Sequence, residues 1–357
     1  MRRLLLGTAG AHNCAMLARL PRPFAVLFAL AFAAALAWAV TAPSQAIVKA
    51  APDNYTDMRL YRDIVERMDK GESYYAAATG QQRMHEYPTQ PFVTVRLPTL
   101  YWLAHTFGWS ALGTLEIALL LANTVIWPLA MPGALTRTER GAIGVAVFLG
   151  GLACASPALT PMSETWCGLL IGLATALTLW RKAPWWLPLA CIAAALTVRE
   201  LAFAFVPLAA LFAWIDGRRR EVAAWGLLAV LFAIGLLFHA RAVAPHVLPG
   251  DLASPGWSSG LGLRGLLQAL VGTTLLQQLE RGPAMALALL PLLGWLALEW
   301  RAGRFVLLCL AGYALAIALF PRPDNFYWGF LLLPAWAAGL ALVPRGAWQL
   351  GRAISSR

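Results

Sequence analysis

Charged residues and cysteines are both scarce in this sequence, and each scarcity excludes a class of protein. Only 13% of the 357 residues are charged, whereas 60% are hydrophobic. This composition argues against a soluble enzyme and places most of the chain in lipid. The five cysteines are an odd number, and four lie in apolar runs, where a small buried side chain is the expected role. The sequence contains no spacing typical of a zinc site, so we assign no metal-ligating residues.

Acidic residues are also few, 17 against 28 Lys and Arg, and their distribution predicts a topology. About 20 residues cross the hydrocarbon core, and shorter helices suffice inside a protein. Sixteen Lys and Arg but only four acids fall on the side of the termini, against twelve of each on the other side. The positive-inside rule therefore predicts that both termini are cytoplasmic. The net charge of +11 reflects this topology, and no nucleic-acid partner is expected. The predicted spans are 24–41, 111–130, 141–158, 164–180, 184–198, 200–215, 222–242, 282–300, 304–320 and 326–343.

The fold class predicted is an all-α polytopic membrane protein of about ten transmembrane helices with a large first outer loop. A cytoplasmic tail, 1–23, precedes a single transmembrane domain, 24–357, which has outer segments at 42–110 and 243–281. The first apolar run is longer than the core of a signal peptide, which favours a retained anchor over a cleaved leader. We expect a multi-pass protein of the bacterial inner membrane.

Two surface helices and one half-embedded helix are predicted in the outer segments. From Asp57 to Lys70, apolar residues recur at a spacing of three, four and seven, and opposite charges lie four apart on the other face. This pattern is typical of an amphipathic helix on a membrane surface, and Gly71 is a natural end for it. Leu263–Glu280 is expected to form a second surface helix, and Phe92–Phe107 a helix half embedded in the membrane.

A charged turn is predicted between two short apolar helices, 184–198 and 200–215. One continuous span here would be too long and would place the following arginines outside the cell. As two helices, they put the turn at Arg199-Glu200 below the outer surface. Charges at that depth are tolerated only where protein buries them or a wet cavity admits water.

Asp57 is the leading candidate for a catalytic residue. An aspartate at the start of a helix commonly caps it or complements its dipole, and residue type alone favours that structural role. Its context favours chemistry instead, because it follows the first span at the water boundary, beside aromatic and basic residues.

The outer segment resembles a known class of enzymes. The order Asp57, Tyr61, Gly71, Tyr74-Tyr75 and Tyr87-Pro88 is similar to the first outer loop of the GT-C class of membrane glycosyltransferases. These enzymes use polyprenyl-phosphate sugars, and the similarity is greatest to the bacterial branch linked to cell-surface glycopolymers. The turn from Pro321 to Trp328 resembles the same branch, whereas Thr89 stands where many relatives have a second proline. The resemblance implies that Asp57 is the general base on an acceptor hydroxyl.

Sugar transfer from a lipid phosphate also requires cations where negative charge builds on the departing phosphate. Arginine suits this task because its planar group stays charged and grips phosphate. We assign phosphate binding to Arg199, Arg322 and Arg96. Their structural alternatives are an ion pair with Glu200, a turn pair with Asp324, and extension to the headgroups, respectively.

Six further residues are assigned to substrate positioning. Glu164 lies at the start of a predicted helix, and two roles are open for it. It either complements the helix dipole, as acids in this position commonly do, or it positions an acceptor or a metal ion. The six are Tyr61, Tyr87, Glu164, Glu200, Asp324 and Asn325.

The sequence leaves three functions open. In the first, an inverting glycosyltransferase moves a sugar from a polyprenyl phosphate to a glycan or lipid acceptor, and a divalent-cation requirement stays open. In the second, a transporter or flippase carries lipid-linked sugars, although no inverted repeat supports it. In the third, the chain is a non-catalytic member of a polysaccharide-assembly complex.

Overall fold

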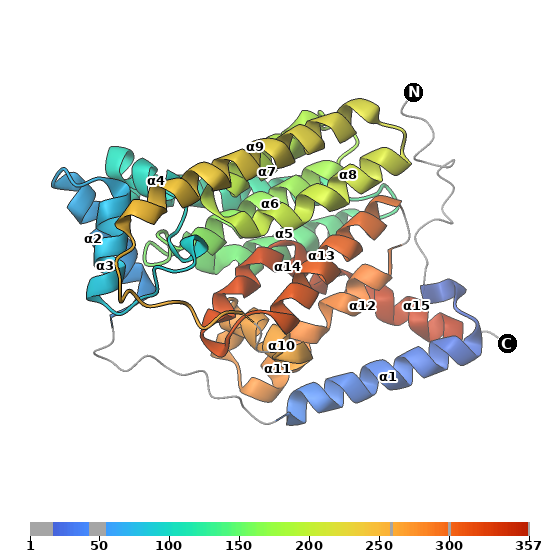
Figure 1. Cartoon of the computed structure of the whole chain (residues 1–357). Coiled ribbons are helices and arrows are strands. Elements are labelled where there is room, and N and C mark those ends of the chain that lie inside the picture. The colour runs from blue at the N-terminus through green and yellow to red at the C-terminus, as the bar shows by residue number, and fades with distance from the viewer. Residues whose placement is uncertain (1–16, 43–54, 258–259, 299–300, 356–357) are drawn as a thin grey trace.

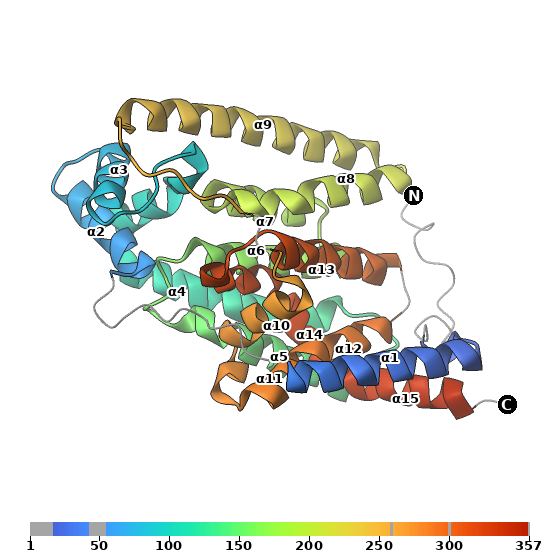
Figure 2. The ribbon, with the colours of Figure 1, turned by 60° about the horizontal axis from the view of Figure 1, so that its bottom comes forward.

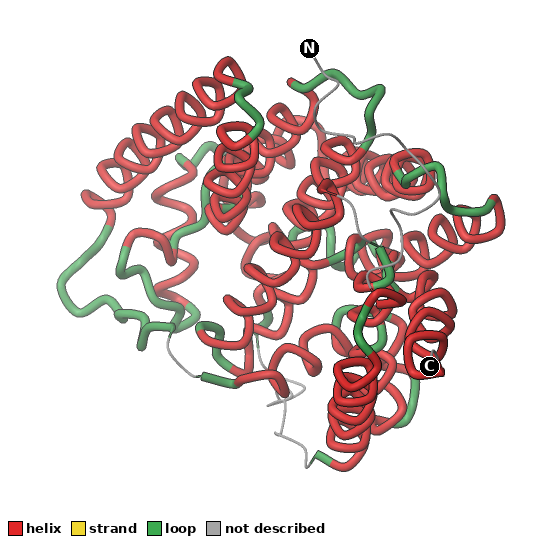
Figure 3. The backbone as a smooth tube through the Cα atoms, turned by 90° about the vertical axis from the view of Figure 1, so that its right-hand side faces the viewer, coloured by secondary structure: helices red, strands yellow, loops and turns green. Residues whose placement is uncertain are grey.

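Helices form nearly all of the regular structure. The computed structural model describes residues 17–42, 55–257, 260–298 and 301–355, and these contain one isolated β-bridge, Gln90 with Ala253, and no strand (Figure 3). The all-α prediction is thus confirmed, whereas most of the predicted cytoplasmic tail lies outside the described residues. The α-helices are α1 (Arg22–Thr41), α2 (Asp57–Asp69), α3 (Tyr74–Met84), α4 (Thr99–Ala130), α5 (Arg137–Gly151), α6 (Ser163–Leu179), α7 (Trp186–Val198), α8 (Phe205–Ile215), α9 (Arg219–Val243), α10 (Gly262–Gly272), α11 (Arg281–Leu289), α12 (Pro291–Leu296), α13 (Arg301–Leu319), α14 (Ala335–Ala338) and α15 (Val343–Ser355).

Four helical segments in the described ranges are long and apolar enough to cross a membrane. They are Arg22–Thr41, Phe92–Ala130, Arg137–Ala155 and Arg219–His246. A fifth arises if the pair Pro323–Leu332 and Ala335–Ser355, bent by 62°, counts as one span. The other predicted spans are shorter apolar helices; α6 is the clearest case, with almost every side chain buried. A short helix surrounded by protein needs no full bilayer crossing, because its ends find polar partners in the bundle.

Three predicted elements differ from the structure. The span predicted at 326–343 is instead the 3₁₀ helix η8 (Pro323–Leu332), followed by α14 and the 3₁₀ helix η9 (Leu340–Leu342), because Pro334 interrupts the helical hydrogen bonds. The surface helix predicted from Leu263 is wrong: α10 ends at Gly272, and its apolar face is buried against η8 and α13. The helix predicted from Phe92 begins only at Thr99, after Pro98, and continues past a break at Gly108 into the span.

Helix α6 runs through the middle of the bundle and contacts α4, α7 and η8 (Figure 1). Glycine permits the closest of these approaches. A Cβ atom at Gly168 would lie 2.0 Å from the carbonyl oxygen of Phe330, and one at Gly294 would lie 1.8 Å from that of Gly339. These contacts bring the backbone of the C-terminal segments directly onto α6 and α12.

The two ends of the bundle carry different parts of the chain. Helices α2 and α3 and the C-terminal end of α9 lie at one end, whereas α15 lies at the opposite end (Figures 1 and 2). Helix α2 has the predicted amphipathic pattern, and Gly71 follows its end with a φ of 93°, but its apolar face is buried against α3 and α4 and does not face a membrane surface as predicted. This arrangement places Asp57 at the end of the bundle that holds the first outer segment.

Candidate functional site

Asp57 occupies the first turn of α2, but it does not cap the helix. Thr56 is the N-cap residue, and its hydroxyl accepts a hydrogen bond from the Arg59 amide at 3.4 Å. The Asp57 carboxyl is therefore available for other partners, and the charge of Arg96 and the hydroxyl of Tyr87 both act on it. Burial raises the pKa of Asp57 above its ordinary value, while Arg96 and the hydrogen bond from Tyr87 act in the opposite direction.

Arg96 precedes α4 and points into the protein rather than toward the headgroups. Its side chain is 16% exposed, and Nε donates a hydrogen bond to the Tyr61 hydroxyl at 3.3 Å. Its Nη2 lies 3.9 Å from Oε1 of Glu164. Tyr61 is itself buried on α2, and this burial raises its pKa to about 12. Arg96 thus links α2 to the start of α6.

Glu164 and Arg199 form a buried ion pair between α6 and the break after α7. Nη2 of Arg199 lies 2.9 Å from Oε1 of Glu164, and the two side chains are 4% and 1% exposed. Arg199 stands in extended conformation between α7 and the 3₁₀ helix η5 (Glu200–Ala204). The predicted charged turn is therefore present. Glu200 contributes a second carboxylate, with Oε1 3.2 Å from Nη1 of Arg199.

Arg199 retains hydrogen-bonding capacity that its protein neighbours do not use. Its Nε is buried and has no hydrogen-bond partner among the described residues. Buried donors in native proteins are almost always satisfied by protein, water or a ligand. An oxygen-bearing ligand is therefore a fitting partner for this guanidinium.

The 3₁₀ helix η8 brings the third predicted arginine to the edge of this cluster. Nε of Arg322 lies 3.4 Å from Oδ1 of Asp324, as the turn-pair interpretation predicts. The charge of Asp324 contributes to raising the pKa of Asp57, although less than burial does. Arg322 and Asn325 also line a small cavity between α10 and α13.

Tyr327 adds a hydroxyl near this site, although it is not among the residues assigned from the sequence. Its hydroxyl accepts a hydrogen bond from Nδ2 of Asn325 at 2.7 Å. It also lies within electrostatic range of Arg96, Glu164 and Asp57. The one sequence signal for it was its position two residues after Asn325, in the turn singled out by resemblance.

Around the start of α2, the start of α6 and the α7–η5 break, the structure forms a polar cluster that includes Asp57, Tyr61, Tyr87, Arg96, Glu164, Arg199 and Glu200, with Asp324 of η8 acting electrostatically on Asp57. Asp57, Arg96, Glu164 and Arg199 form its centre, and Arg322 with Asn325 stands at the margin. Such a site combines a carboxyl able to accept a proton with two guanidinium groups able to bind an anion. Within the described ranges, no three His, Cys, Asp or Glu side chains gather as a metal site would require.

Comparisons with protein-family models, with curated proteins and with solved structures each found no match. The GT-C resemblance of the outer segment therefore stays an expectation.

Proposed function

We propose that the protein is an inverting glycosyltransferase at the outer face of the bacterial inner membrane. It would move a sugar from a polyprenyl phosphate to a glycan or lipid acceptor of the cell envelope. The observation that carries this proposal is the buried cluster in which Glu164 pairs with Arg199 and Arg96, with Asp57 within electrostatic range of Arg96 and Glu164. The carboxyl assigned as base and the guanidinium groups assigned to the phosphate therefore lie in one part of the protein.

In the proposed reaction, the acceptor hydroxyl oxygen attacks the anomeric carbon from the face opposite the phosphate. The hydroxyl proton passes to the Asp57 carboxylate, which acts as general base. The bond between the anomeric carbon and the phosphate oxygen breaks, and its electron pair stays on the departing polyprenyl phosphate. Arg199 and Arg96 then stabilise the charge that develops on that phosphate.

Glu164 holds the two arginines that are assigned to the phosphate. One buried carboxylate holds Arg199 at 2.9 Å and Arg96 at 3.9 Å. It offsets part of the cost of burying two cations before substrate binds. A phosphate oxygen would then satisfy Nε of Arg199, which has no hydrogen-bond partner among the residues that the structure describes. In a low-dielectric site this interaction is stronger than in water.

The remaining polar residues fit substrate positioning. Tyr61 contacts Arg96, and Glu200 contacts Arg199. Tyr87 and Asp324 act on Asp57, and Asn325 donates to the Tyr327 hydroxyl. Hydroxyl, amide and carboxylate groups of this kind recognise sugar hydroxyls through hydrogen bonds. Arg322, at the margin, would add a further cation for the phosphate.

The proposed location follows from the long apolar helices and from the charge distribution. Helices α2 and α3 lie at the opposite end of the bundle from α15, and Lys and Arg outnumber acids on the side of the chain termini. Under the positive-inside rule, the cluster then faces the outside, where lipid-linked sugar donors are presented.

Transfer by the purified protein in proteoliposomes tests the proposal, with radiolabelled polyprenyl-phosphate sugars and cell-envelope acceptors. Asp57→Asn should lower the rate by about 10²- to 10⁴-fold, the usual contribution of a general base. Asp69→Asn is the matched control, because Asp69 lies on the same helix with a side chain 55% exposed. Full activity of Asp57→Asn would refute the assignment. Movement of the intact donor across the bilayer would favour a transporter.

A further inference from the structure

We propose that Tyr74, Tyr75 and His239 form a positioning device that sets the location of the Arg96 guanidinium. This inference rests on the proposed function, because it gives a role to a tyrosine pair that the reaction itself does not use. None of the three side chains needs to touch the substrate. They act on the backbone that carries Arg96.

Tyr74 holds the carbonyl group of Arg96 directly. Its hydroxyl donates a hydrogen bond to that oxygen at 2.6 Å, and its side chain is 4% exposed. Its ring packs against Tyr101 of α4, with ring centroids 5.0 Å apart. A buried and packed ring leaves the hydroxyl little freedom, so the carbonyl has a defined partner.

Tyr75 holds the preceding carbonyl group through His239 of α9. Nε2 of His239 lies 3.0 Å from the carbonyl oxygen of Val95, and Nδ1 lies 3.2 Å from the Tyr75 hydroxyl. Because a carbonyl only accepts, Nε2 must carry the proton and donate. Nδ1 of the neutral ring then accepts from Tyr75, which fixes the ring orientation.

Two adjacent tyrosines on α3 therefore secure two adjacent carbonyl groups, one directly and one through a histidine. The Arg96 side chain has looser contacts than its backbone, with Tyr61 at 3.3 Å and Glu164 at 3.9 Å. The position of the backbone thus sets which partners the guanidinium can reach. A displacement of about 1 Å in a substrate-positioning group can cost about 10²-fold in rate.

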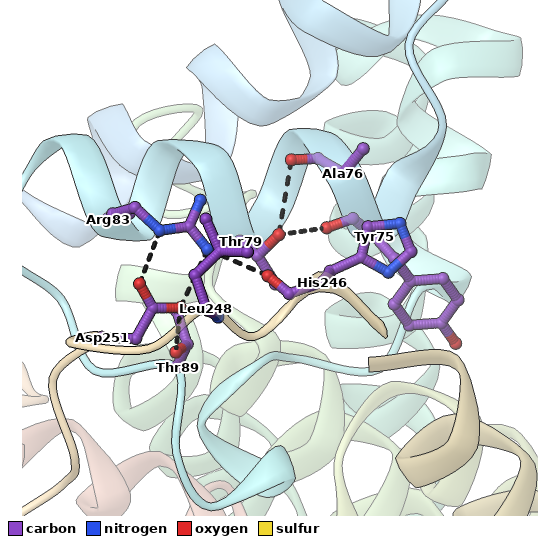
Figure 4. Close-up of polar contacts among 8 residues, drawn as sticks. All are labelled: Tyr75, Ala76, Thr79, Arg83, Thr89, His246, Leu248 and Asp251. Carbon is purple, nitrogen blue, oxygen red and sulfur yellow. Dashed lines mark hydrogen bonds and ion pairs between the residues drawn. The ribbon is translucent and has the colours of Figure 1, made fainter. Parts of the chain in front are cut away.

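Helix α3 is anchored to the same end of α9, which keeps the device together (Figure 4). Nη2 of Arg83 donates to Oδ2 of Asp251 at 2.8 Å and to the carbonyl oxygen of His246 at 2.9 Å. The Thr89 hydroxyl donates to Oδ2 of Asp251 at 3.0 Å. These contacts join α3 to the connector after α9, so Tyr75 and His239 remain opposed.

Steady-state kinetics of His239→Leu and His239→Gln test the device. Leucine removes the donor to Val95, whereas the glutamine amide can replace it. His239→Leu should raise the KM for the lipid donor and lower kcat/KM by about 10- to 100-fold, with the acceptor KM unchanged. His239→Gln should stay close to wild type. A purely structural defect would reduce the active fraction and leave the donor KM unchanged.

Coupling to Arg96 gives a second kinetic criterion. In an Arg96→Ala background, His239→Leu should have little further effect, because the positioned group is gone. Tyr74→Phe, which keeps the packed ring, should show the same donor-specific loss if His239→Leu fails to fold. Equal losses in the presence and absence of Arg96 would overturn the proposal.

Hydrogen exchange separates this inference from the proposed function. The amides of Thr94 and Val95 are hydrogen-bonded within this segment, and they should exchange faster in Tyr74→Phe and His239→Leu but not in His239→Gln. Absence of transfer by the wild-type protein would contradict the proposed function alone. Unchanged exchange in both Tyr74→Phe and His239→Leu would overturn the positioning device, whatever the activity.

Discussion

The Glu164–Arg199 pair offers the sharpest test of the buried charge cluster. Glu164→Gln removes the carboxylate charge while preserving side-chain volume. The two side chains are 1% and 4% exposed, so the Arg199 guanidinium stays buried after the substitution. Breaking a buried pair by removing one partner costs about 3–5 kcal/mol. Glu200 remains 3.2 Å from Arg199, so we expect the lower end, about 3 kcal/mol.

Titration with a denaturing detergent in mixed micelles measures this loss as a change in the free energy of unfolding. The double variant Glu164→Gln/Arg199→Met removes both charges and should recover at least about 1 kcal/mol relative to the sum of the single losses. The control is Glu72→Gln, whose partner is Arg67. These side chains are about 30% exposed, and an exposed pair contributes about 0–1 kcal/mol.

Two results would refute the reasoning. A loss below about 1 kcal/mol for Glu164→Gln would show that the pair is solvated like an exposed one. Additive losses in the double variant would show that the two side chains do not interact.

Three further predictions concern pH and packing. Burial raises the pKa of Asp57 above its ordinary 3.8, and the carboxylate protonates as pH falls through that raised value. The pH profile of kcat/KM should therefore show an acidic limb above pH 3.8. A flat profile down to pH 4 would contradict this. The Arg83 hydrogen bond lowers the pKa of Asp251 well below its ordinary 3.8, so the stabilising effect of Asp251 should be complete above pH 3.8 and should decrease gradually as pH falls further. Asp251→Asn, compared with wild type in unfolding titrations, should cost about 1.5–3 kcal/mol at neutral pH. A difference as large at pH 2 as at pH 7 would argue against the linkage. Gly294→Ala should lower the free energy of unfolding by about 1–3 kcal/mol, because the added Cβ would lie 1.8 Å from a backbone oxygen. Its control is Gly312→Ala, in open space on α13, which should be neutral or stabilising. Equal thermal stabilities of these two variants would contradict the close approach.

Local features of the fold followed from the sequence. The spacing of apolar residues from Asp57 predicts α2, and the structure ends that helix at Asp69, two residues before Gly71. The charged break at Arg199 followed from length, because one span through 184–215 would be too long for a bilayer. Both inferences rest on neighbouring residues and on the thickness of the membrane.

Tertiary packing could not be predicted from the sequence. An apolar face such as that of α10 suits a membrane surface and a protein core equally well, and only packing against η8 and α13 decides between them. The same holds for η8 and α14, where composition suggests one continuous helix and Pro334 breaks it.

Within the site, the sequence predicted local pairs and missed distant ones. Arg199 with Glu200 and Arg322 with Asp324 are near neighbours in the chain, and both pairs are present. The contact between His239 and Val95 joins residues 144 positions apart. No periodicity connects such residues, because their approach depends on how α9 packs beside the segment that precedes α4.

The most direct test of the account is a balance of products from the wild-type protein in sealed proteoliposomes. Mass spectrometry of one sample would quantify released polyprenyl phosphate and newly formed glycoside together, and NMR would determine the anomeric configuration. A transferase with Asp57 as base and Arg199 on the phosphate predicts equal amounts of both products and an inverted anomeric centre. Donor that crosses the bilayer with its glycosyl–phosphate bond intact, without any glycoside, would contradict it.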